Sequence, residues 1–381
     1  MALLVKDEDI TSLAPMGEVV DALEIALADH ARGSAPFYPR RVNVRTRMKD
    51  NKARYALNTQ VGGSVALNVM AVRLMSNMTS QVRRGEKRNA ADEGHNHKNW
   101  GVIVLFDMTT SEMLAVLPQF SMSGLRVGAT TGLGAKYLAR QDACRVGVFG
   151  TSKVARADLE GIAYARKLER VKVFSPNADH RADFVKDMSD RLGIEIISVD
   201  SPEEVVKDAD IINVATSSHR PVFDGDWLLP GQYVSTTKSM PFPRQSLDPK
   251  WEELYGMPLP ADGMEIDVKT LARADMIATL SREMILNENQ RDVLDLIDAG
   301  TLKWDKFREL SAIIAGLAPG RERPEDLIVY KSSGGIGLQM AALGLVVLRN
   351  ARKRGIGLEI PGDWFSADMS SWHEKGFTPT Q

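Results

Sequence analysis

GVFGTSKVARADLEG, residues 147–161, changes from a strand pattern to a helix pattern at a single glycine. The apolar run before Gly150 is typical of a buried strand, and the alanine-rich segment after it has the spacing of an amphipathic helix. A dinucleotide-binding domain has such a turn in its first βα unit, where a Gly-x-Gly-x-x-Gly/Ala fingerprint surrounds the pyrophosphate. Gly150 and Ala155 occupy the first and third positions of the fingerprint, and Ser152 occupies the second. Because the helix N-terminus still offers backbone N–H groups, the sequence predicts a dinucleotide held slightly farther from the backbone.

Short β-rich runs and amphipathic segments alternate from about residue 121 to about residue 282. The runs are RVGVFG, RVKVFSP, EIISVD, DIINVATS, QYVSTT and DMIATLS, and the segments between them include VARADLEGIAYARKL, ADHRADFVKDMSDRLG and PEEVVKDA. Parallel strands need crossover helices that cover the faces of the sheet, so this alternation predicts an α/β fold with a doubly wound parallel sheet. A helix, SGLRVGATTGLGAKYLAR, is expected before the first strand, with Ser121 as its cap.

The first 120 residues have a different pattern, with one helix followed by several strands. MGEVVDALEIALADHARG predicts a helix that ends at Gly33, and the runs RRVNVRT, RYALNTQV, NVMAVRLMSN and GVIVLFDMTTSEMLAVL predict a largely antiparallel sheet. Residues 79–99 have almost no apolar side chains, so we expect a long exposed loop, whose His95 and His97 either reach an active site or remain solvated. The tail, residues 362–381, is expected to form a surface arm.

Composition excludes several classes of function. Lys and Arg total 48 and Asp and Glu total 50 in 381 residues, so the charge gives no general attraction to nucleic acid or to an anionic membrane. No segment has the run of about 20 apolar residues that a membrane span needs, and the N-terminus lacks the pattern of a signal peptide. Cys144 is the single cysteine, which excludes an intrachain disulfide and a cysteine-rich zinc site. We predict a cytoplasmic protein without a metal.

Polar residues follow the strands of the predicted parallel sheet. The second strand ends without the Asp or Glu that usually binds the ribose of NAD, and hydrogen-bond donors follow it instead, so NADP(H) is favoured over NAD(H). The alternative is a doubly wound domain that binds no nucleotide. The predicted cofactor-binding residues are Gly150, Thr151, Ser152, Lys153 and Val154 at the first turn, Ser175, Asn177 and Arg181 after the second strand, and Thr216, Ser217 and Thr236 after later strands.

Four stretches in order along the chain resemble the ornithine cyclodeaminase and μ-crystallin family. They are SGLRVGATTGLGAKYLAR, VGVFGTSKVARADLEG, INVATSSHRPVF and SSGGIGLQMAALG. The resemblance implies a discontinuous α+β domain for substrate binding and dimerisation, formed by residues 1–122 and 321–381. A Rossmann-type dinucleotide-binding domain, residues 123–320, is inserted into it, and the protein is expected to be a homodimer.

The resemblance also implies a group of cations that bind the substrate carboxylate. Members of the family hold it with two Arg and one Lys; Arg40 matches the first position, with Arg41 as an alternative register, and Arg126 matches the second. Arg73 stands at the position of the Lys. Arginine can clamp a carboxylate with two hydrogen bonds but does not deprotonate near neutral pH, so carboxylate binding is kept and lysine chemistry is lost. We expect Arg40, Arg73 and Arg126 to bind substrate, and Arg73 and Arg126 to support catalysis.

Two further positions depart from the family pattern. Met240 stands where cyclodeaminases carry an Asp that acts on the amine, and methionine neither accepts a proton nor pairs with an ammonium ion. Lys238 is a candidate catalytic replacement, as is a loop histidine, although Lys238 also fits a solvated side chain. Val127 stands where the family often has Thr, which removes a hydroxyl near the cofactor.

These observations favour an NAD(P)H-dependent oxidoreductase of carbon–nitrogen bonds. The expected reaction is reduction of a small imino acid or cyclic ketimine carboxylate, or the reverse oxidation of an amino acid, because an imine needs less acid–base catalysis than deamination does. The first alternative is an ornithine-type cyclodeaminase, an ammonia-lyase that recycles NAD. The second is a non-catalytic protein that binds a small ligand or a nucleotide.

Overall fold

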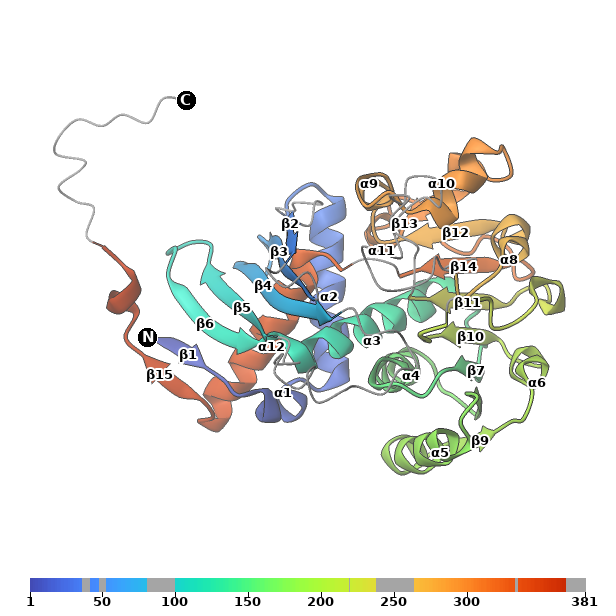
Figure 1. Ribbon diagram of the computed structural model, residues 1–381, viewed down its shortest axis with the longest axis horizontal. Coiled ribbons are helices and arrows are strands. Elements are labelled where there is room, and N and C mark those ends of the chain that lie inside the picture. The colour runs from blue at the N-terminus through green and yellow to red at the C-terminus, as the bar shows by residue number, and fades with distance from the viewer. Residues whose placement is uncertain are drawn as a thin grey trace.

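Two β-sheets and the helices around them form the protein (Figure 1). The computed structural model describes residues 1–35, 42–47, 53–80, 100–218, 220–237, 264–332 and 335–367. Within these ranges, the helices are too short or too polar to cross a lipid bilayer. The long helix α3 (Gln119–Leu138) lies between the two sheets (Figure 1).

The first sheet has the order β15-β1-β6-β5-β4-β3-β2 in the described residues. Its strands are β1 (Ala2–Leu4), β2 (Val42–Arg47), β3 (Ala53–Ser64), β4 (Val69–Ser80), β5 (Trp100–Asp107), β6 (Met113–Pro118) and β15 (Leu358–Ile360). All neighbouring pairs are antiparallel except β1 with β6, which confirms the largely antiparallel sheet. The helices α2 (Met16–Ala31) and α12 (Gly337–Arg354) pack against this sheet, where α12 contacts β3, β4 and β5, and α1 (Asp7–Leu13) packs against α3 and α12.

The second sheet has the order β13-β12-β14-β11-β10-β7-β8-β9 in the described residues, and all of its pairs are parallel. Its strands are β7 (Arg145–Phe149), β8 (Arg170–Phe174), β9 (Glu195–Ser198), β10 (Ile211–Val214), β11 (Tyr233–Thr236), β12 (Met276–Thr279), β13 (Phe307–Glu309) and β14 (Ile328–Lys331). Every residue of β10, β11 and β14 is buried, as expected for central strands covered on both faces. The predicted doubly wound parallel sheet is confirmed.

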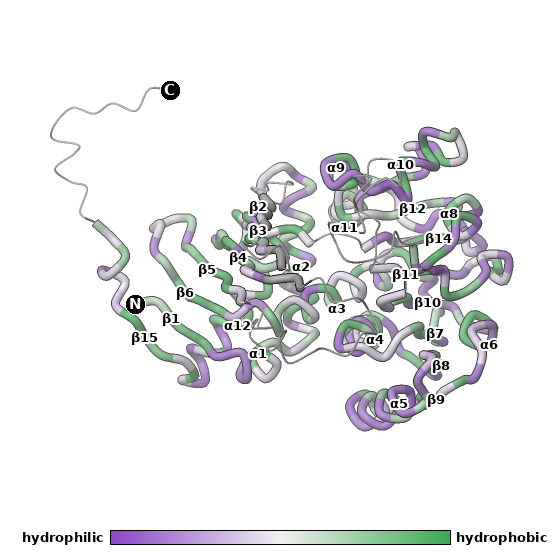
Figure 2. The backbone as a smooth tube through the Cα atoms, viewed as in Figure 1, coloured by the Kyte–Doolittle hydropathy of each residue, from purple (hydrophilic) through white to green (hydrophobic). Residues whose placement is uncertain are grey.

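The helices of this second half are α4 (Lys153–Ala165), α5 (Ala178–Leu192), α6 (Pro202–Val206), α8 (Val268–Arg273), α9 (Arg282–Asn287), α10 (Arg291–Asp298) and α11 (Leu310–Ile314). Most of α5 is hydrophilic (Figure 2), and Phe184 and Met188 are the residues of this helix that are buried. The amphipathic pattern of its sequence therefore reflects a helix at the surface of the sheet.

The structure differs from the sequence prediction at one domain boundary and at one helix cap. The strand β14 lies between β11 and β12 in the parallel sheet, so that sheet extends past the predicted boundary at residue 320. The division of the chain into two domains itself stays a prediction. Ser121 does not cap α3, because the helix begins at Gln119; its backbone N–H and its hydroxyl instead donate to the Asp7 carboxylate at 3.1 and 2.8 Å.

Helices α3 and α4 pack with their backbones in direct contact. A side chain at Gly161 would overlap the carbonyl oxygen of Gly128, and one at Gly132 would come within 2.5 Å of the Gly161 carbonyl oxygen. These glycines allow α3, which carries Arg126, to lie directly on the first helix of the parallel sheet. The close contact joins α3 to the parallel sheet through α4.

Replacing Gly161 with alanine should lower the free energy of unfolding by about 2 kcal/mol, because the added methyl group overpacks this contact. The matched control is Gly124→Ala on α3, where an added Cβ has no atom within 4 Å. That change should stabilise the protein by roughly 0.5 kcal/mol or more through helix propensity. Denaturant unfolding of both variants checks the pair, and equal effects of the same sign would contradict the proposed contact.

Candidate active site

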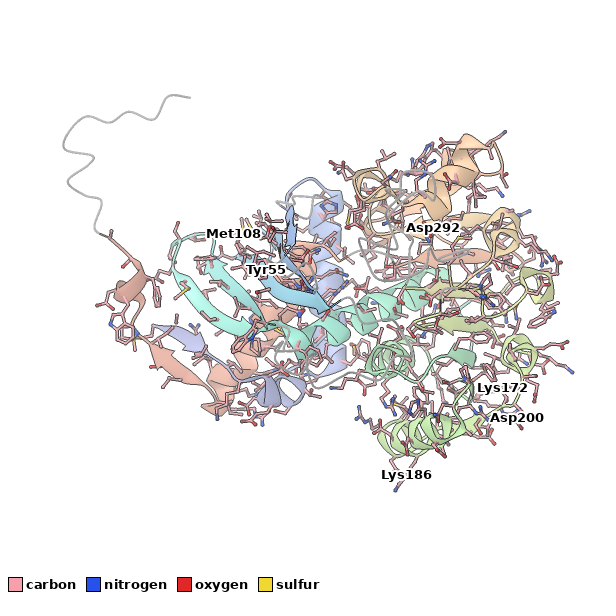
Figure 3. All side chains as sticks on the ribbon, viewed as in Figure 1. Tyr55, Met108, Lys172, Lys186, Asp200 and Asp292 are labelled. Carbon is pink, nitrogen blue, oxygen red and sulfur yellow. The ribbon has the colours of Figure 1, made fainter. Side chains whose placement is uncertain are left out.

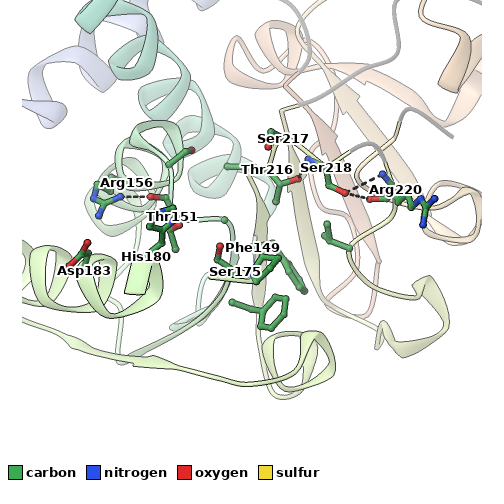
Figure 4. A pocket seen from close by; sticks show the side chains of 16 residues that line it. Phe149, Thr151, Arg156, Ser175, His180, Asp183, Thr216, Ser217, Ser218 and Arg220 are labelled. Atoms are coloured by element: carbon green, nitrogen blue, oxygen red, sulfur yellow. Dashed lines mark hydrogen bonds between the residues drawn. The ribbon is translucent and has the colours of Figure 1, made fainter. Parts of the chain in front are cut away.

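A cleft of about 930 Å³ opens at the carboxyl ends of β7, β8 and β10 (Figure 4). It is lined by Phe149, Gly150, Thr151, Ser152, Arg156, Phe174, Ser175, Pro176, His180, Asp183, Ala215, Thr216, Ser217, Ser218, Arg220 and Val222. The strand order reverses direction between β7 and β10, and ligands of open α/β sheets bind outside the strand ends at such a point. The predicted turn after β7 therefore faces a space of the size that a nucleotide needs.

Gly150 is required by its backbone geometry. Its φ angle is +103°, and a Cβ there would overlap the carbonyl oxygen of Ala215. Its N–H donates to the Phe174 carbonyl oxygen at 2.9 Å, which joins the ends of β7 and β8. The first position of the fingerprint thus has the role that the sequence predicts, a tight bend that only glycine accommodates.

Ser152 is the N-cap of α4, since its Oγ accepts the N–H of Ala155 at 3.2 Å. The hydroxyl satisfies one of the free amides of the helix, and Ser152 with Thr151 still lines the cleft. Lys153 and Val154 do not line it: the Lys153 ammonium lies 5.3 Å from the ring centre of Phe120. The serine therefore leaves the cleft open while it begins the helix.

Arg156 lines the same cleft and was not predicted from the sequence. Its Nη1 donates to the Thr151 carbonyl oxygen (Figure 4). Its Nε lies 2.7 Å from the Asp187 carboxylate, and its guanidinium lies 5.0 Å from the ring centre of Phe184. These contacts join the turn after β7 to α5. The only signal in the sequence was an arginine one turn into the helix that follows Gly150.

Beyond β8, the structure separates the three predicted residues. Ser175 lines the cleft, whereas Asn177 caps α5 by accepting the N–H of His180 at 2.9 Å. Arg181 donates to the Ser175 carbonyl oxygen at 2.7 Å and to Asp200 at 2.9 Å, a residue that follows β9 at the outer edge of the sheet (Figure 3). Arg181 thus contacts the backbone of Ser175 and does not itself line the cleft.

Opposite the turn after β7, residues 216–218 form the other rim of the cleft. Thr216, Ser217 and Ser218 all line it, and the Ser218 hydroxyl donates to the Arg220 carbonyl oxygen at 2.6 Å (Figure 4). Thr236 is fully buried below this rim. The hydroxyls of Thr216 and Thr236 both donate to Glu265, a buried carboxylate that the sequence analysis did not single out.

Arg73 is buried in the antiparallel sheet, with 8% of its surface exposed. Its guanidinium donates to Gln60 on β3, to the sulfur of Met75, and to the Gln119 amide oxygen at 2.9 Å. Gln60 in turn donates to the carbonyl oxygen of Gly335. The amide of Gln60 therefore connects Arg73 to the segment that precedes α12.

Arg126 reaches the same segment from α3. A Cβ added at Gly335 would lie 2.7 Å from the Arg126 Cζ, and the Arg126 Nη1 donates to the Gln339 amide oxygen at 3.2 Å. The Gln339 amide also donates to the Thr130 hydroxyl at 2.6 Å, which ties α12 to α3. Two arginines from distant parts of the sequence thus connect to the segment around Gly335, Arg126 directly and Arg73 through Gln60. The resemblance predicted both, but nothing in the sequence indicated the amides of Gln60, Gln119 and Gln339.

Asp158 is a fully buried carboxylate on α4 that the sequence analysis missed. Its oxygens accept from the Thr131 hydroxyl at 3.0 Å and from the Asn213 amide at 3.2 Å. Burial raises the pKa of Asp158 to about 7; these two hydrogen bonds and the charge of Arg126 oppose the rise, and the charge of Glu265 adds to it. A carboxyl group therefore titrates near neutral pH between α3, α4 and β10.

Several predicted residues lie outside the described residues: Arg40, its alternative Arg41, Lys238, Met240, His95 and His97. Thr79 and Ser80, which were expected in the loop at residues 79–99, belong to β4, and residues 81–99 lie outside the described residues. The roles of these six residues outside the described ranges remain predictions. The structure connects Arg73 and Arg126 to the same segment before α12, and it brings Gly150, Thr151 and Ser152 to one cleft with Ser175, Thr216 and Ser217.

Similar proteins cover almost the whole chain. The Delta(1)-pyrroline-2-carboxylate reductase of Bacillus cereus is 26% identical over 373 residues, which is 94% of this chain and 99% of that protein. The structure of the Thermococcus litoralis Delta(1)-pyrroline-2-carboxylate reductase, in complex with NADH and L-proline, matches with a TM-score of 0.74 and 24% identity over 94% of this chain and 100% of that one. The structure of the Paracoccus denitrificans iminosuccinate reductase, in complex with NAD⁺, matches with a TM-score of 0.74 and 21% identity over 94% and 99%.

The solved structures support the fold, and a family model identifies the chain. The model of the ornithine cyclodeaminase/mu-crystallin family matches residues 2–354, which include every described strand of the two sheets except β15, the cleft, and both Arg73 and Arg126. The resemblance found in the sequence is thereby confirmed. This protein belongs to the ornithine cyclodeaminase/mu-crystallin family.

Proposed function

We propose that this protein is an NAD(P)H-dependent oxidoreductase that reduces the carbon–nitrogen double bond of a small imino acid or cyclic ketimine carboxylate. The observation that carries this proposal is that Arg73, through Gln60, and Arg126, directly, both connect to the segment that precedes α12. Two guanidinium groups that reach one segment from two elements are suited to bind a carboxylate through paired hydrogen bonds. The names of the relatives, a pyrroline-2-carboxylate reductase and an iminosuccinate reductase, denote reduction of imines that carry carboxylates.

The residues around the cleft fit a dinucleotide. Gly150 leaves room where a Cβ would overlap Ala215, the α4 N-terminus presents backbone N–H groups, and Thr216 and Ser217 offer hydroxyls on the opposite rim. When bound, the nicotinamide supplies a hydride to the imine carbon. Arg73 and Arg126 orient the substrate by its carboxylate, and a proton must reach the imine nitrogen from Lys238, a loop histidine or water.

The preference for NADP(H) over NAD(H) is part of this proposal. Ser175 and His180 line the cleft beyond β8 and offer hydrogen-bond donors near the expected position of a 2′-phosphate, and Arg181 donates to the Ser175 carbonyl oxygen. Asp183, also in the lining, is the group that would oppose it. The two solved relatives hold NADH and NAD⁺. Titration with both reduced cofactors tests the preference: tighter binding of NADPH supports it, and equal or tighter binding of NADH overturns it.

We also propose a homodimer and a chain of two domains. The sequence predicts one domain from residues 1–122 and 321–381, and the other from residues 123–320. Because β14 (Ile328–Lys331) lies in the parallel sheet, we place the end of the dinucleotide-binding domain after β14 and not at residue 320. The expected substrate is a free amino or imino acid in the cytoplasm. Sedimentation of the purified protein measures the oligomeric state.

An assay with purified protein tests the reaction itself. Δ1-pyrroline-2-carboxylate, or imines formed from a 2-oxo acid and ammonia, should be reduced with oxidation of one NAD(P)H per product. Ammonia release from ornithine without added cofactor would instead indicate a cyclodeaminase. If the protein binds neither NADH nor NADPH, the proposed oxidoreductase activity is overturned and a non-catalytic ligand-binding protein is favoured.

A further inference from the structure

Glu265 connects the ends of two neighbouring strands beneath the cleft. Only 1% of its surface is exposed. One carboxylate oxygen accepts the N–H and the hydroxyl of Thr216, which follows β10, at 3.0 and 2.9 Å. The other accepts the Thr236 hydroxyl at the end of β11 at 2.7 Å and the N–H of Thr237 at 3.0 Å. Four donors from two strand ends therefore converge on a single side chain.

The Thr216 side of this arrangement belongs to the rim of the cleft. The Thr216 hydroxyl, which donates to Glu265, also accepts the N–H of Ser218 at 3.2 Å. The orientation of this one hydroxyl thus sets the turn through residues 216–218, which line the cleft. The same segment contacts the opposite rim, because a Cβ at Gly150 would overlap the Ala215 carbonyl oxygen and lie 3.4 Å from the Thr216 Cγ2.

A carboxylate suits this position better than an amide does. Each oxygen of Glu265 accepts one backbone N–H and one hydroxyl. A hydroxyl can rotate to accept a hydrogen bond, but a backbone N–H can only donate. Glutamine would direct its NH₂ group at one of the two backbone N–H groups, and a buried donor without an acceptor is costly. One of the two strand ends would then move.

We propose that Glu265 is a positioning residue for the dinucleotide: it holds the Thr216–Ser218 rim in the conformation that binds the cofactor opposite Gly150. This inference rests on the proposed function, since it assigns the cleft to a dinucleotide. It predicts that the loss of the carboxylate changes affinity for the cofactor before it changes the chemical step. Glu265 acts through Thr216 and does not itself line the cleft.

The test compares Glu265→Gln with Asp210→Asn. Asp210 is a buried carboxylate at the opposite end of β10, where it accepts the backbone N–H groups of Cys144 and Arg145 at 3.1 and 3.0 Å. Both changes remove the charge of a buried carboxylate, but only Glu265 is joined to the cleft. The dissociation constants of NADH and NADPH are measured by fluorescence titration of the full chain, with unfolding of each variant followed in parallel.

We expect Glu265→Gln to raise the dissociation constant of the preferred dinucleotide about tenfold, the effect of one lost buried hydrogen bond. The kcat at saturating cofactor should stay within about twofold of the wild type, and Asp210→Asn should leave the dissociation constant unchanged. Unchanged affinity in Glu265→Gln, or an equal loss in both variants, overturns the positioning role. If Glu265→Gln does not fold, Thr236→Val takes its place, because the buried Thr236 hydroxyl donates to Glu265 and does not line the cleft: a weakened affinity supports the role and an unchanged one refutes it. If the wild-type protein binds neither dinucleotide, the proposed function fails instead.

Discussion

Replacing Arg126 with alanine should lower kcat/KM for the imino acid by about 100- to 1,000-fold. Loss of one partner of a buried, charged hydrogen-bonded pair costs about 3 to 4 kcal/mol, which corresponds to this range. Arg126 meets Gly335 and donates to Gln339, and it lies outside the lining of the dinucleotide cleft. The dissociation constant of the cofactor should therefore change little. Steady-state kinetics and a cofactor titration measure the two quantities separately.

Two further variants sharpen this experiment. Arg126→Lys keeps the positive charge but loses the paired donors of the guanidinium, so its loss of activity should fall between the wild type and alanine. Arg321→Ala is the matched control: Arg321 donates to the carbonyl oxygens of Pro324 and of Leu138, the last residue of α3 and 12 positions beyond Arg126, so its loss should lower stability alone. A kcat/KM close to that of the wild type in Arg126→Ala would remove this residue from the substrate site.

Replacing Asp158 with asparagine should stabilise the protein at pH 8 and have a smaller effect at pH 5. Burial raises the pKa of Asp158 from 3.8 to about 7 in the folded protein. Between these values the folded state binds more protons than the unfolded state, so the stability contributed by this group falls as the pH rises. Above pH 7 the whole penalty is present, on the order of 4 kcal/mol for a shift of this size. Asparagine does not ionise, and its amide can donate to the Thr131 hydroxyl while its oxygen accepts from Asn213.

Denaturant unfolding of the wild type and of Asp158→Asn across this pH range measures the effect. The difference between the two proteins should grow from pH 5 to pH 8 in favour of the variant. Asp210→Asn provides a control with the opposite sign: burial acts to raise the pKa of Asp210, but hydrogen bonds from Arg145 and Cys144 outweigh it and lower the pKa. That variant should lose stability at pH 8. Parallel stability profiles for the wild type and Asp158→Asn would contradict a titration of Asp158 near neutral pH.

Local patterns were sufficient to predict most of the fold. The alternation of β-rich runs with amphipathic segments predicted the parallel sheet, and the structure confirms it, because crossover helices and buried strands have periods that are visible within about ten residues. The bend at Gly150 was predicted for the same reason, since its left-handed backbone needs glycine regardless of the rest of the chain. The position of β14 was not predicted, because β-strand pairing depends on neighbours that are distant in the sequence.

The site depended on contacts that no short stretch of sequence contains. Gln60 and Gly335 are 275 positions apart, yet their hydrogen bond connects Arg73 to the segment beside Arg126. Glu265 lies 49 positions from Thr216, and nothing near it in sequence indicates that four donors will surround its carboxylate. Periodicity and turn chemistry act over a few residues and therefore determine strands, helices and tight bends. The partners of a buried polar side chain are chosen by the packing of whole elements, so only the tertiary structure decided which carboxylates and amides support the cleft and the two arginines.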